Sequence, residues 1–304
     1  MLITALLALA AVLLDWWWGE PRRWHPLVGF GWLSDLVERS FYGSENVTPR
    51  GRKLRGVIAL MLMLVPFTAI AAALAALPYV GMVFSLLMLY FAIGHRSLHD
   101  HARPIATALQ DGDDAKARHL TSHLVSRDSA AINPPGAATE SVLENGNDGV
   151  FGALFWFIVA GGAGAILYRL ANTLDAMWGY RSERYVAFGW GAARFDDLLN
   201  YFPARLTALT YALLGNSRRA LHCWRTQAPD WESPNAGPVM AAGAGALNLM
   251  MGGPARYRGE WHQRPVLGAG IPAVVGDIER ALTLVRHGVF LWLVVLAAVG
   301  LAYV

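Results

Sequence analysis

Charged residues are scarce in this sequence. Asp, Glu, Lys and Arg make up 15% of its 304 residues, against roughly 25% in an ordinary soluble domain. None occurs between Arg55 and Arg96, a gap of 40 residues, and such a gap is about twice as long as one membrane crossing. Hydrophobic residues account for 55% of the chain. This composition excludes a soluble enzyme and a disordered chain, and it predicts an integral membrane protein.

Cysteine and lysine are also rare. The single cysteine, Cys223, excludes a disulfide framework and a cysteine-based zinc site. Only Lys53 and Lys116 are lysines, so the formal net charge of +3 rests almost entirely on arginine. Arginines that flank membrane helices explain the basic balance better than a nucleic-acid partner does, and we expect no nucleic-acid binding.

The apolar stretches predict an all-α, polytopic membrane bundle of five or six membrane-embedded helices joined by polar connecting helices. We expect one integral membrane domain over residues 1–304. The predicted membrane helices are residues 1–18, 57–77, 79–94, 151–170, 201–215 and 284–304. Glycines 161, 162 and 164 in the fourth of these would permit close helix packing.

The stretch 233–255 is free of charge but is built from Gly, Ala, Pro and Asn. Lipid-facing backbone must satisfy its own hydrogen bonds, so a stretch this interrupted should be buried or line a cavity. We interpret it as a re-entrant or core element. The arginine-rich linker 18–55 is cytoplasmic by the positive-inside rule, and a hairpin at Pro78 would return residues 95–149 to the same side. The side of the membrane stays open after residue 150.

Acidic and amide side chains gather between residues 138 and 149. Pro134 and Pro135 are well placed to start a helix. On such a helix Glu140, Glu144 and Asp148 share one face. Stacked carboxylates need a cation or a proton, and oxygen ligands suit Mg²⁺. The alternative is a solvated acidic face, which the spacing alone favours.

Polar residues recur with helical spacing further along the chain. Asn172 and Asp175 are three apart, as are Arg194 and Asp197. The alternative here is an ion pair between an arginine and a neighbouring aspartate. Arg127, beside Asp128, could bind a phosphate, with a local salt bridge as an equal alternative. For the histidines at 95 and 99, a helix end at the membrane surface is favoured over a metal site.

At these residues the sequence resembles the CobD/CbiB family of cobalamin biosynthesis, the membrane enzymes called adenosylcobinamide-phosphate synthase. The similarity covers essentially the whole chain. The motifs that carry it, in order, are Asp15-x3-Gly19-Glu20-Pro21-x3-His25-Pro26, Arg127-Asp128, Glu140-Ser141-x2-Glu144-Asn145-x2-Asp148-Gly149, Asn172-Thr173-Leu174-Asp175-x-Met177-x-Gly179-Tyr180, Ala193-Arg194-x-Asp196-Asp197-x2-Asn200, Pro203-Ala204-Arg205-Leu206, Ser233-Pro234-Asn235-Ala236-Gly237 and Gly252-Gly253-x3-Tyr257-x-Gly259. Small departures at Gly146, Asn147 and Ala176 remove no charged group.

The resemblance implies an ATP-dependent amide-forming ligase in the bacterial cytoplasmic (inner) membrane, which it crosses several times. Such an enzyme joins aminopropanol or its phosphate to the propionate carboxylate of adenosylcobyric acid, its corrinoid substrate, giving adenosylcobinamide or its phosphate. The expected route uses ATP and Mg²⁺ through an acyl phosphate. The implied partners are these substrates, the lipid bilayer, and either further copies of the chain or other membrane enzymes of cobalamin assembly.

The resemblance also implies roles for individual residues, all expected to fold into one pocket. The expected catalytic residues are Glu140, Glu144, Asp148, Asp175 and Asp197. The expected substrate- or phosphate-binding residues are Arg127, Asn145, Asn172, Arg194, Asn200, Arg205 and Asn235. The expected Mg²⁺ ligands are Glu144, Asp148, Asp196 and Asp197.

The alternative from another class is a non-enzymatic membrane transporter or scaffold, for which intramembrane carboxylates and interrupted helices are also typical. Inverted repeats would favour transport, and no convincing one is found in the sequence. The amine substrate, the use of ATP by this chain and its oligomeric state stay open at this stage.

Overall fold

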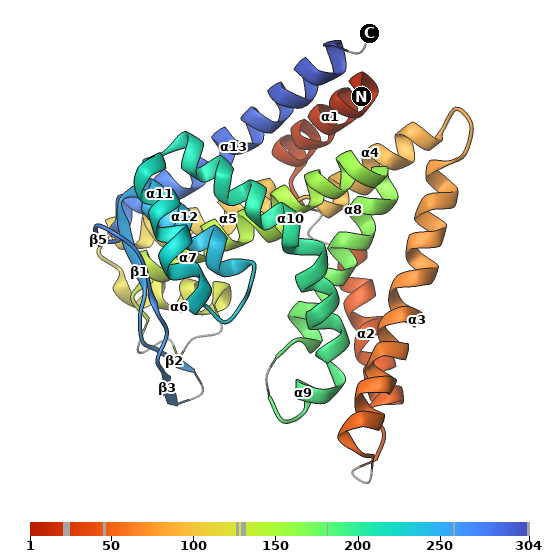
Figure 1. The fold of residues 1–304 in the computed structure, drawn as a ribbon, viewed down its shortest axis with the longest axis horizontal. Helices are drawn as coiled ribbons and strands as arrows, with labels where there is room; N and C mark the ends of the chain where they lie inside the picture. Colours follow the sequence, from red (N-terminus) through yellow and green to blue (C-terminus); the bar gives the residue numbers. More distant parts are fainter. Residues whose placement is uncertain are drawn as a thin grey trace. The chain divides into compact units, whose positions relative to one another are not determined.

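A computed structural model of the chain describes residues 1–20, 25–44, 47–125, 128, 132–180, 182–257 and 259–302. The structure is 79% helical (Figure 1), which confirms the predicted all-α bundle class. It groups into two compact units. Unit 1 comprises Met1–Gly94, Gly152–Asn200 and Val299–Val304, and unit 2 comprises His95–Phe151 and Tyr201–Ala298. The single domain expected from the sequence stays a prediction.

Unit 1 is built from helices. They are α1 (Leu2–Trp18), α2 (Pro26–Tyr42), α3 (Pro49–Ala75), α4 (Gly81–Ala92), α8 (Gly152–Trp178), the short α9 (Tyr185–Phe188) and the first part of α10 (Trp190–Leu214). α8 packs against α3 and α4, while α2 packs against α3 and α8, and α1 against α4. The start of α3 is fixed by Thr48, whose Oγ1 accepts a hydrogen bond from the Gly51 N–H at 3.2 Å, and by Pro49 in the first turn.

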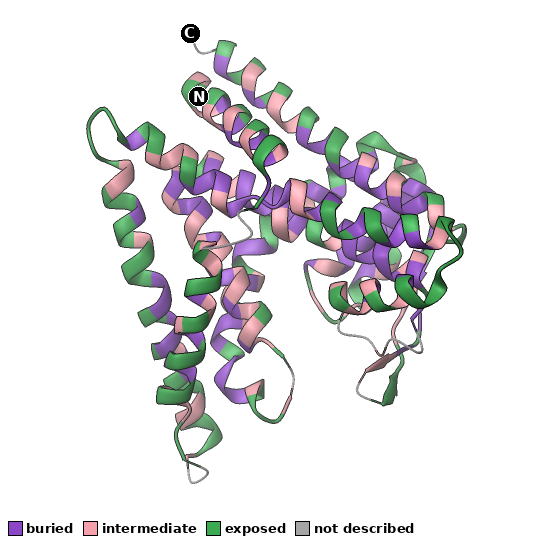
Figure 2. Cartoon of the chain, turned by 180° about the vertical axis from the view of Figure 1, so that it is seen from behind, coloured by how far each residue is buried: buried purple, intermediate pink, exposed green. Residues whose placement is uncertain are grey.

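The outer face of α3 is apolar, which is the reverse of a soluble helix. Figure 2 shows long exposed stretches on this helix, and Ile58, Leu62 and Val65 are among the exposed side chains. Its buried face carries Leu60 and Met63. A helix that is hydrophobic on all sides suits a membrane, where the outer face meets lipid.

In the part of the chain that the structure describes, four helical segments are long and apolar enough to cross a membrane. They are Pro49–Ala75, Gly81–Gln110, Pro134–Trp178 and Val275–Ala302. Four of the predicted spans (57–77, 79–94, 151–170 and 284–304) overlap these segments. The predicted span 1–18 corresponds to α1, a shorter apolar helix of 17 residues. The predicted span 201–215 is the second part of α10 and not a separate helix.

The predicted span 151–170 is not one straight helix. Ala160 (φ −134°) and Gly161 (φ 64°) leave helical geometry inside α8 and kink it. Glycine tolerates the positive φ that this break requires. Just beyond the kink, a Cβ at Gly162 would meet Ser85 and Met88 of α4 at 2.8 Å. The close packing predicted for these glycines is therefore confirmed at Gly162.

Unit 2 combines helices with a small β region that the sequence did not predict. Its helices are α5 (His95–Gln110), α6 (Asp114–Leu124), α7 (Pro134–Gly146), the π-helical turn η2 (Asn147–Phe151), the rest of α10, α11 (Ser217–Gln227), the 3-10 turn η3 (Ala228–Asp230), α12 (Ala236–Leu247) and most of α13 (Val275–Ala302). Its strands are β1 (Leu249–Gly252), β2 (Ala255–Tyr257), β3 (Glu260–His262), β4 (Val266–Gly268) and β5 (Ile271–Pro272). β1 pairs antiparallel with β4, with Met251 opposite Leu267, and parallel with β5. β2 and β3 form a separate hairpin.

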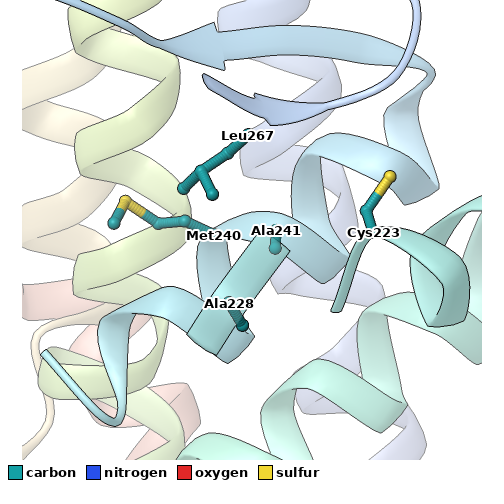
Figure 3. Close-up of a cluster of buried hydrophobic side chains, with 5 residues drawn as sticks. All are labelled: Cys223, Ala228, Met240, Ala241 and Leu267. Carbon is teal, nitrogen blue, oxygen red and sulfur yellow. The ribbon is translucent and has the colours of Figure 1, made fainter. Parts of the chain in front are cut away.

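The Gly/Ala-rich stretch 233–255 contains α12, which lies in the interior of unit 2. Every residue from Gly237 to Leu247 is buried, as a core element requires. α12 packs against α11, α7 and strands β1 and β4. Small residues allow these close approaches, because a Cβ at Gly245 would meet the backbone of α11 at 2.8 Å. Figure 3 shows the buried cluster on this side of α12, formed by Cys223, Ala228, Met240, Ala241 and Leu267.

Candidate functional site

Unit 1 contains a buried carboxylate, Asp196, held between two amides. Only 8% of Asp196 is exposed. Asn200 Nδ2 donates to its Oδ2 at 3.0 Å and Asn172 Nδ2 to its Oδ1 at 3.4 Å. The Tyr168 hydroxyl in turn donates to Asn200 Oδ1 at 2.9 Å, which fixes the orientation of that amide. α8 supplies Tyr168 and Asn172, while α10 supplies Asp196 and Asn200 one turn apart.

The electrostatics of this cluster favour a proton or a cation. Burial, followed by the negative charge of Asp175, raises the pKa of Asp196 from 3.8 to about 7. The hydrogen bonds from the two asparagines act in the opposite direction, and Asp197 adds a smaller upward effect. The negative charges of two further carboxylates therefore make it harder for the buried carboxyl of Asp196 to ionise. A divalent cation would stabilise the ionised form of all three.

Asp197 and Asp175 border the same cluster. Arg194 Nη1 lies 3.6 Å from Asp197 Oδ2, and the two side chains are 66% and 28% exposed. This is the ion pair that the sequence left open as the alternative at these positions. Asp175 is confined by Gly179, whose N–H donates to the Asp175 carbonyl at 2.7 Å. A Cβ at Gly179 would overlap the Asp175 carboxylate, so glycine is required there for space.

In unit 2, Glu140 is clamped by an arginine that the sequence analysis did not single out. Arg264 Nη2 lies 3.2 Å from Glu140 Oε2, and only 15% and 6% of the two side chains are exposed. The Gly252 N–H also donates to Glu140 Oε1 at 2.7 Å. Arg264 Nε donates to the Gly253 carbonyl at 3.1 Å. Glu140 therefore has its cation from the protein, and it holds the turn after β1 in place.

This turn forms part of the wall of a cavity of about 280 Å³ in unit 2. The cavity is lined by Asn133, which precedes α7, by Glu140 in the middle of that helix, and by residues 250–255. Gly252 (φ 79°) and Gly253 (φ 76°) are consecutive left-handed residues, a conformation that favours glycine. The polar groups of this turn are paired within the protein: the Gly252 N–H donates to Glu140, and the Gly253 N–H donates to the Pro265 carbonyl at 3.0 Å.

The remaining acidic residues of α7 do not continue a single α-helical face. Pro134 begins α7 as predicted, but the chain passes into a π-helical turn at Asn147. The prediction that Asp148 follows in α-helical register is therefore wrong, because the wider turn shifts it. Asn147 Nδ2 donates to Asp148 Oδ1 at 2.8 Å, and the Thr207 hydroxyl donates to Asn147 Oδ1 at 3.0 Å.

Two more predicted residues lie near the end of α7. Glu144 is half-buried in its last turn. Asn145 is exposed, and its Nδ2 donates to the Ser141 carbonyl and to Ser141 Oγ, both at 2.9 Å. A π-helical turn of this kind is frequent at functional sites, where it re-aims side chains.

Arg205 and Asn235 are brought together within unit 2. Arg205 Nη1 donates to Asn235 Oδ1 at 2.8 Å, and Nη2 donates to the Pro234 carbonyl at 3.2 Å. The guanidinium also lies 3.6 Å above the Tyr201 ring. Arg205 therefore fixes the loop that precedes α12.

Arg127 and the two histidines at 95 and 99 do not belong to either group of site residues described above. Arg127 lies outside the described residues. Its neighbour Asp128 pairs with the distant Arg256 at 3.5 Å and accepts a hydrogen bond from the Gly259 N–H at 2.7 Å. The His95 and His99 rings are buried, with centroids 5.3 Å apart. Over the described ranges, no group of three or more His, Cys, Asp or Glu side chains is placed to hold a metal ion.

The predicted residues thus divide between the two units. Unit 1 brings together Asn172, Asp175, Asp196, Asp197 and Asn200. Unit 2 holds Glu140, Glu144, Asn145, Asp148, Arg205 and Asn235. Because the two sets of residues belong to different units, the prediction of one shared pocket stays a prediction.

Sequence reasoning missed three residues that fix these side chains: Tyr168, Thr207 and Arg264. Only Tyr168 left a usable signal, since it precedes Asn172 and Asp175 with helical spacing of four and seven residues. Arg264 reaches Glu140 across 124 residues of sequence, and no periodicity reports such a contact.

The fold and these residues define a helical protein with four membrane-length apolar segments in its described part and two sets of buried polar side chains. A family model described as "CobD/Cbib protein" matches residues 8–285. The chain belongs to the CobD/CbiB family of cobalamin biosynthesis proteins.

Relatives support the same assignment over nearly the full length. The chain is 56% identical over 304 residues to "Cobalamin biosynthesis protein CobD" of Chromobacterium violaceum, covering 98% of this chain and 96% of the relative. It is 56% identical over 301 residues to the protein of that name in Stutzerimonas stutzeri, with 98% of each covered. Identity is 39% over 288 residues to that of Mycobacterium tuberculosis, with 91% of this chain and 90% of the relative covered. No solved structure matches the chain.

Proposed function

We propose that this protein is an ATP-dependent amide ligase that joins aminopropanol or its phosphate ester to the propionate carboxylate of adenosylcobyric acid. The observation that carries the proposal is the oxygen-rich cluster around Asp196, found in a chain of a cobalamin-biosynthesis family. We further propose that it acts in the bacterial inner membrane, which its apolar helical segments cross several times.

The oxygen donors of unit 1 are of the kind that Mg²⁺ prefers, and no three acidic side chains among the described residues converge on one metal position. Carboxylates at Asp196, Asp197 and Asp175 and the amide oxygen of Asn172 are hard oxygen ligands, which Mg²⁺ prefers. Burial and the charge of Asp175 raise the pKa of Asp196, and a bound cation would favour its ionised form. Mg²⁺ commonly takes only one or two protein carboxylates and fills its other positions with water and substrate phosphate. A cluster with fewer than three convergent ligands is therefore sufficient. Bound there, Mg²⁺ would neutralise phosphate charge.

The reaction requires activation of a carboxylate, because amide formation from a free carboxylate is unfavourable in water. In the proposed route a carboxylate oxygen attacks the γ-phosphorus of ATP, ADP leaves, and the amine then displaces phosphate from the acyl phosphate. The attacking amine must lose a proton to a base. We assign the base to the acidic residues at Glu144, Asp148, Asp175 or Asp197. We assign phosphate neutralisation to Arg194 and Arg205.

The alternative of a membrane transporter draws on the same intramembrane polarity. Family membership favours biosynthesis instead. The two functions differ in one direct respect, since only the ligase makes a new covalent product.

The test is a reconstituted reaction. Purified protein in mild detergent receives adenosylcobyric acid, aminopropanol phosphate, ATP and Mg²⁺, and the amide product is measured by mass spectrometry together with ADP and phosphate. We expect equal amounts of product, ADP and phosphate, and none when any one component is omitted. With the propionate carboxylate labelled with ¹⁸O, the acyl phosphate route places one label in the released phosphate, whereas an adenylate route places it in AMP.

Two variants test the assigned residues. Glu144→Gln and Asp197→Asn should each abolish turnover while keeping expression and the elution profile of the wild type. Asp35→Asn, which removes an exposed carboxylate of α2 in the same unit as Asp197, serves as the matched control and should keep full activity. No product from folded wild-type protein would contradict the ligase and favour the transporter. Full activity in both variants would contradict only the residue assignment.

A further inference from the structure

Unit 1 contains an apolar cavity that the proposed reaction does not use. Its volume is about 390 Å³, and it lies among α2, α3, α4 and α8. This is within the range of roughly 300–1,000 Å³ typical of small-molecule sites. Side chains such as Phe30, Phe67, Met88 and Phe91 form its wall. Among its described lining residues, Arg169 of α8 is the only charged one.

Arg169 presents a cation to this space. Its Nε is buried and has no hydrogen-bond partner among the described residues. No carboxylate in the described part of the chain forms an ion pair with it. Arg169 as a whole is only partly buried, but its Nε is removed from water with no anion among the described residues to offset the loss of hydration. The cavity therefore calls for a ligand that brings a negative charge.

The neighbouring histidine does not supply that charge. His25 caps α2, with its Nδ1 accepting a hydrogen bond from the Leu27 N–H at 3.2 Å, and its ring packs against Phe91 with centroids 6.0 Å apart. Burial lowers the pKa of His25; the Glu20 carboxylate acts against this, and the charge of Arg169 adds to it. A neutral His25 neither repels an anion nor balances Arg169.

We propose that this cavity binds an anionic phospholipid, with an acyl chain against the apolar wall and the phosphate on the guanidinium of Arg169. The ligand must combine hydrocarbon with an anion, because one cation stands in a wall that is otherwise apolar. Small soluble phosphates bring the charge but would leave the apolar surface unfilled. A phosphate matches the planar fork of arginine donors, and the apolar outer face of α3 places this part of the chain in contact with lipid.

The experiment measures lipid binding by native mass spectrometry. Delipidated full-length protein is titrated with phosphatidylglycerol, with phosphatidylcholine, and separately with inorganic phosphate. Arg169→Gln removes the charge. Gly29→Leu fills the cavity, since Gly29 lines it and a Cβ there meets nothing within 4 Å. The matched controls are Arg39→Gln, exposed on α2, and Gly276→Leu, whose added Cβ is equally open.

We expect wild type and both controls to bind phosphatidylglycerol alike. Arg169→Gln and Gly29→Leu should each bind it at least about tenfold more weakly, the loss that corresponds to one charge-assisted hydrogen bond. Arg169→Lys should bind with intermediate affinity. Thermal melting shows that each variant is folded.

Unchanged phosphatidylglycerol binding in either Arg169→Gln or Gly29→Leu would overturn the proposal. Equal binding of phosphatidylcholine, insensitive to Arg169, would overturn it as well. Phosphate binding that depends on Arg169 while lipid binding does not would assign the cavity to a soluble anion instead. Each of these outcomes is independent of whether the amide product forms.

Discussion

Replacing Asp196 by asparagine separates the charge of this side chain from its packing. Burial and Asp175 raise the pKa of Asp196 from 3.8 to about 7. A carboxyl whose pKa is raised by folding contributes stability that is fully present below pH 3.8 and is lost as pH rises towards 7. The loss of stability is complete at about pH 7. Because each pKa unit corresponds to about 1.4 kcal/mol, the total loss of unfolding free energy is about 4 kcal/mol. Asparagine carries no charge at any pH and avoids this loss.

The variant also disturbs one hydrogen bond. Asn200 donates to Asp196 Oδ2 at 3.0 Å, and the Tyr168 hydroxyl prevents the Asn200 amide from turning over without loss of another bond. If asparagine places its amide group opposite Asn200, the variant loses about 1 kcal/mol at every pH. The net gain at pH 8 is then about 3 kcal/mol, or several degrees in the melting temperature of a protein of this size.

The measurement is thermal unfolding in detergent at pH 5 and pH 8, in the absence of divalent cations. The stability difference between Asp196→Asn and wild type should grow by about 3 kcal/mol between these values, since about two pKa units of the loss fall in that interval. Asp35→Asn should show no such pH-dependent gain. A constant difference between pH 5 and pH 8 would refute the assignment of a raised pKa to Asp196.

Three further predictions concern the site residues of the two units. The affinity for Mg²⁺ should rise about tenfold per pH unit below pH 7 and level off above it, because one proton must leave Asp196 before the metal binds. Mn²⁺ can serve as a spectroscopic substitute in this measurement. An affinity that does not vary with pH would contradict the prediction. Gly179→Ala should displace the Asp175 carboxylate and reduce turnover more than tenfold, with some loss of stability because the added Cβ would also lie 2.7 Å from the Asp175 carbonyl oxygen. Gly276→Ala, in open space, should keep both turnover and stability. Glu140→Ala should lower the unfolding free energy by about 3 kcal/mol, because Arg264 is left buried and unpaired. The double variant Glu140→Ala, Arg264→Met should recover part of this free energy. Chemical denaturation measures both, and an equal loss of unfolding free energy in the single and the double variant would contradict the prediction.

The sequence was informative where local patterns decide the structure. Long charge-free stretches predicted α3 and α13, and Pro134 marked the first turn of α7. Helical spacing grouped Asn172 with Asp175 and Arg194 with Asp197, and the second pair forms an ion pair. These features depend on neighbours within one or two turns, and intervals in the sequence report them directly.

Features that depend on distant contacts escaped prediction. The strands β1–β5 are two to four residues long and lie in a Gly-rich segment, so none shows a period of two. The kink at Ala160 in α8 and the π-helical turn at Asn147 change the register of helices that the sequence reads as continuous. Arg264 was overlooked because it lies 124 residues from the carboxylate it neutralises.

The contrast between Glu140 and Asp196 bears on which carboxylates take part in chemistry. Both are buried acids in motifs of the same family, and the resemblance implied a catalytic role for Glu140 and an Mg²⁺-binding role for Asp196. Glu140 meets an arginine and a backbone N–H, so its charge is balanced within the fold and serves to hold the Gly252 turn. Asp196 meets two neutral amides and the field of two other aspartates, so its charge is left for a ligand to balance. A buried charge that the protein itself does not balance marks a functional site more strongly than a paired one. By this criterion the Asp196 cluster is where mutational tests of the ligase should begin, and Glu140 belongs among the residues that shape the cavity of unit 2.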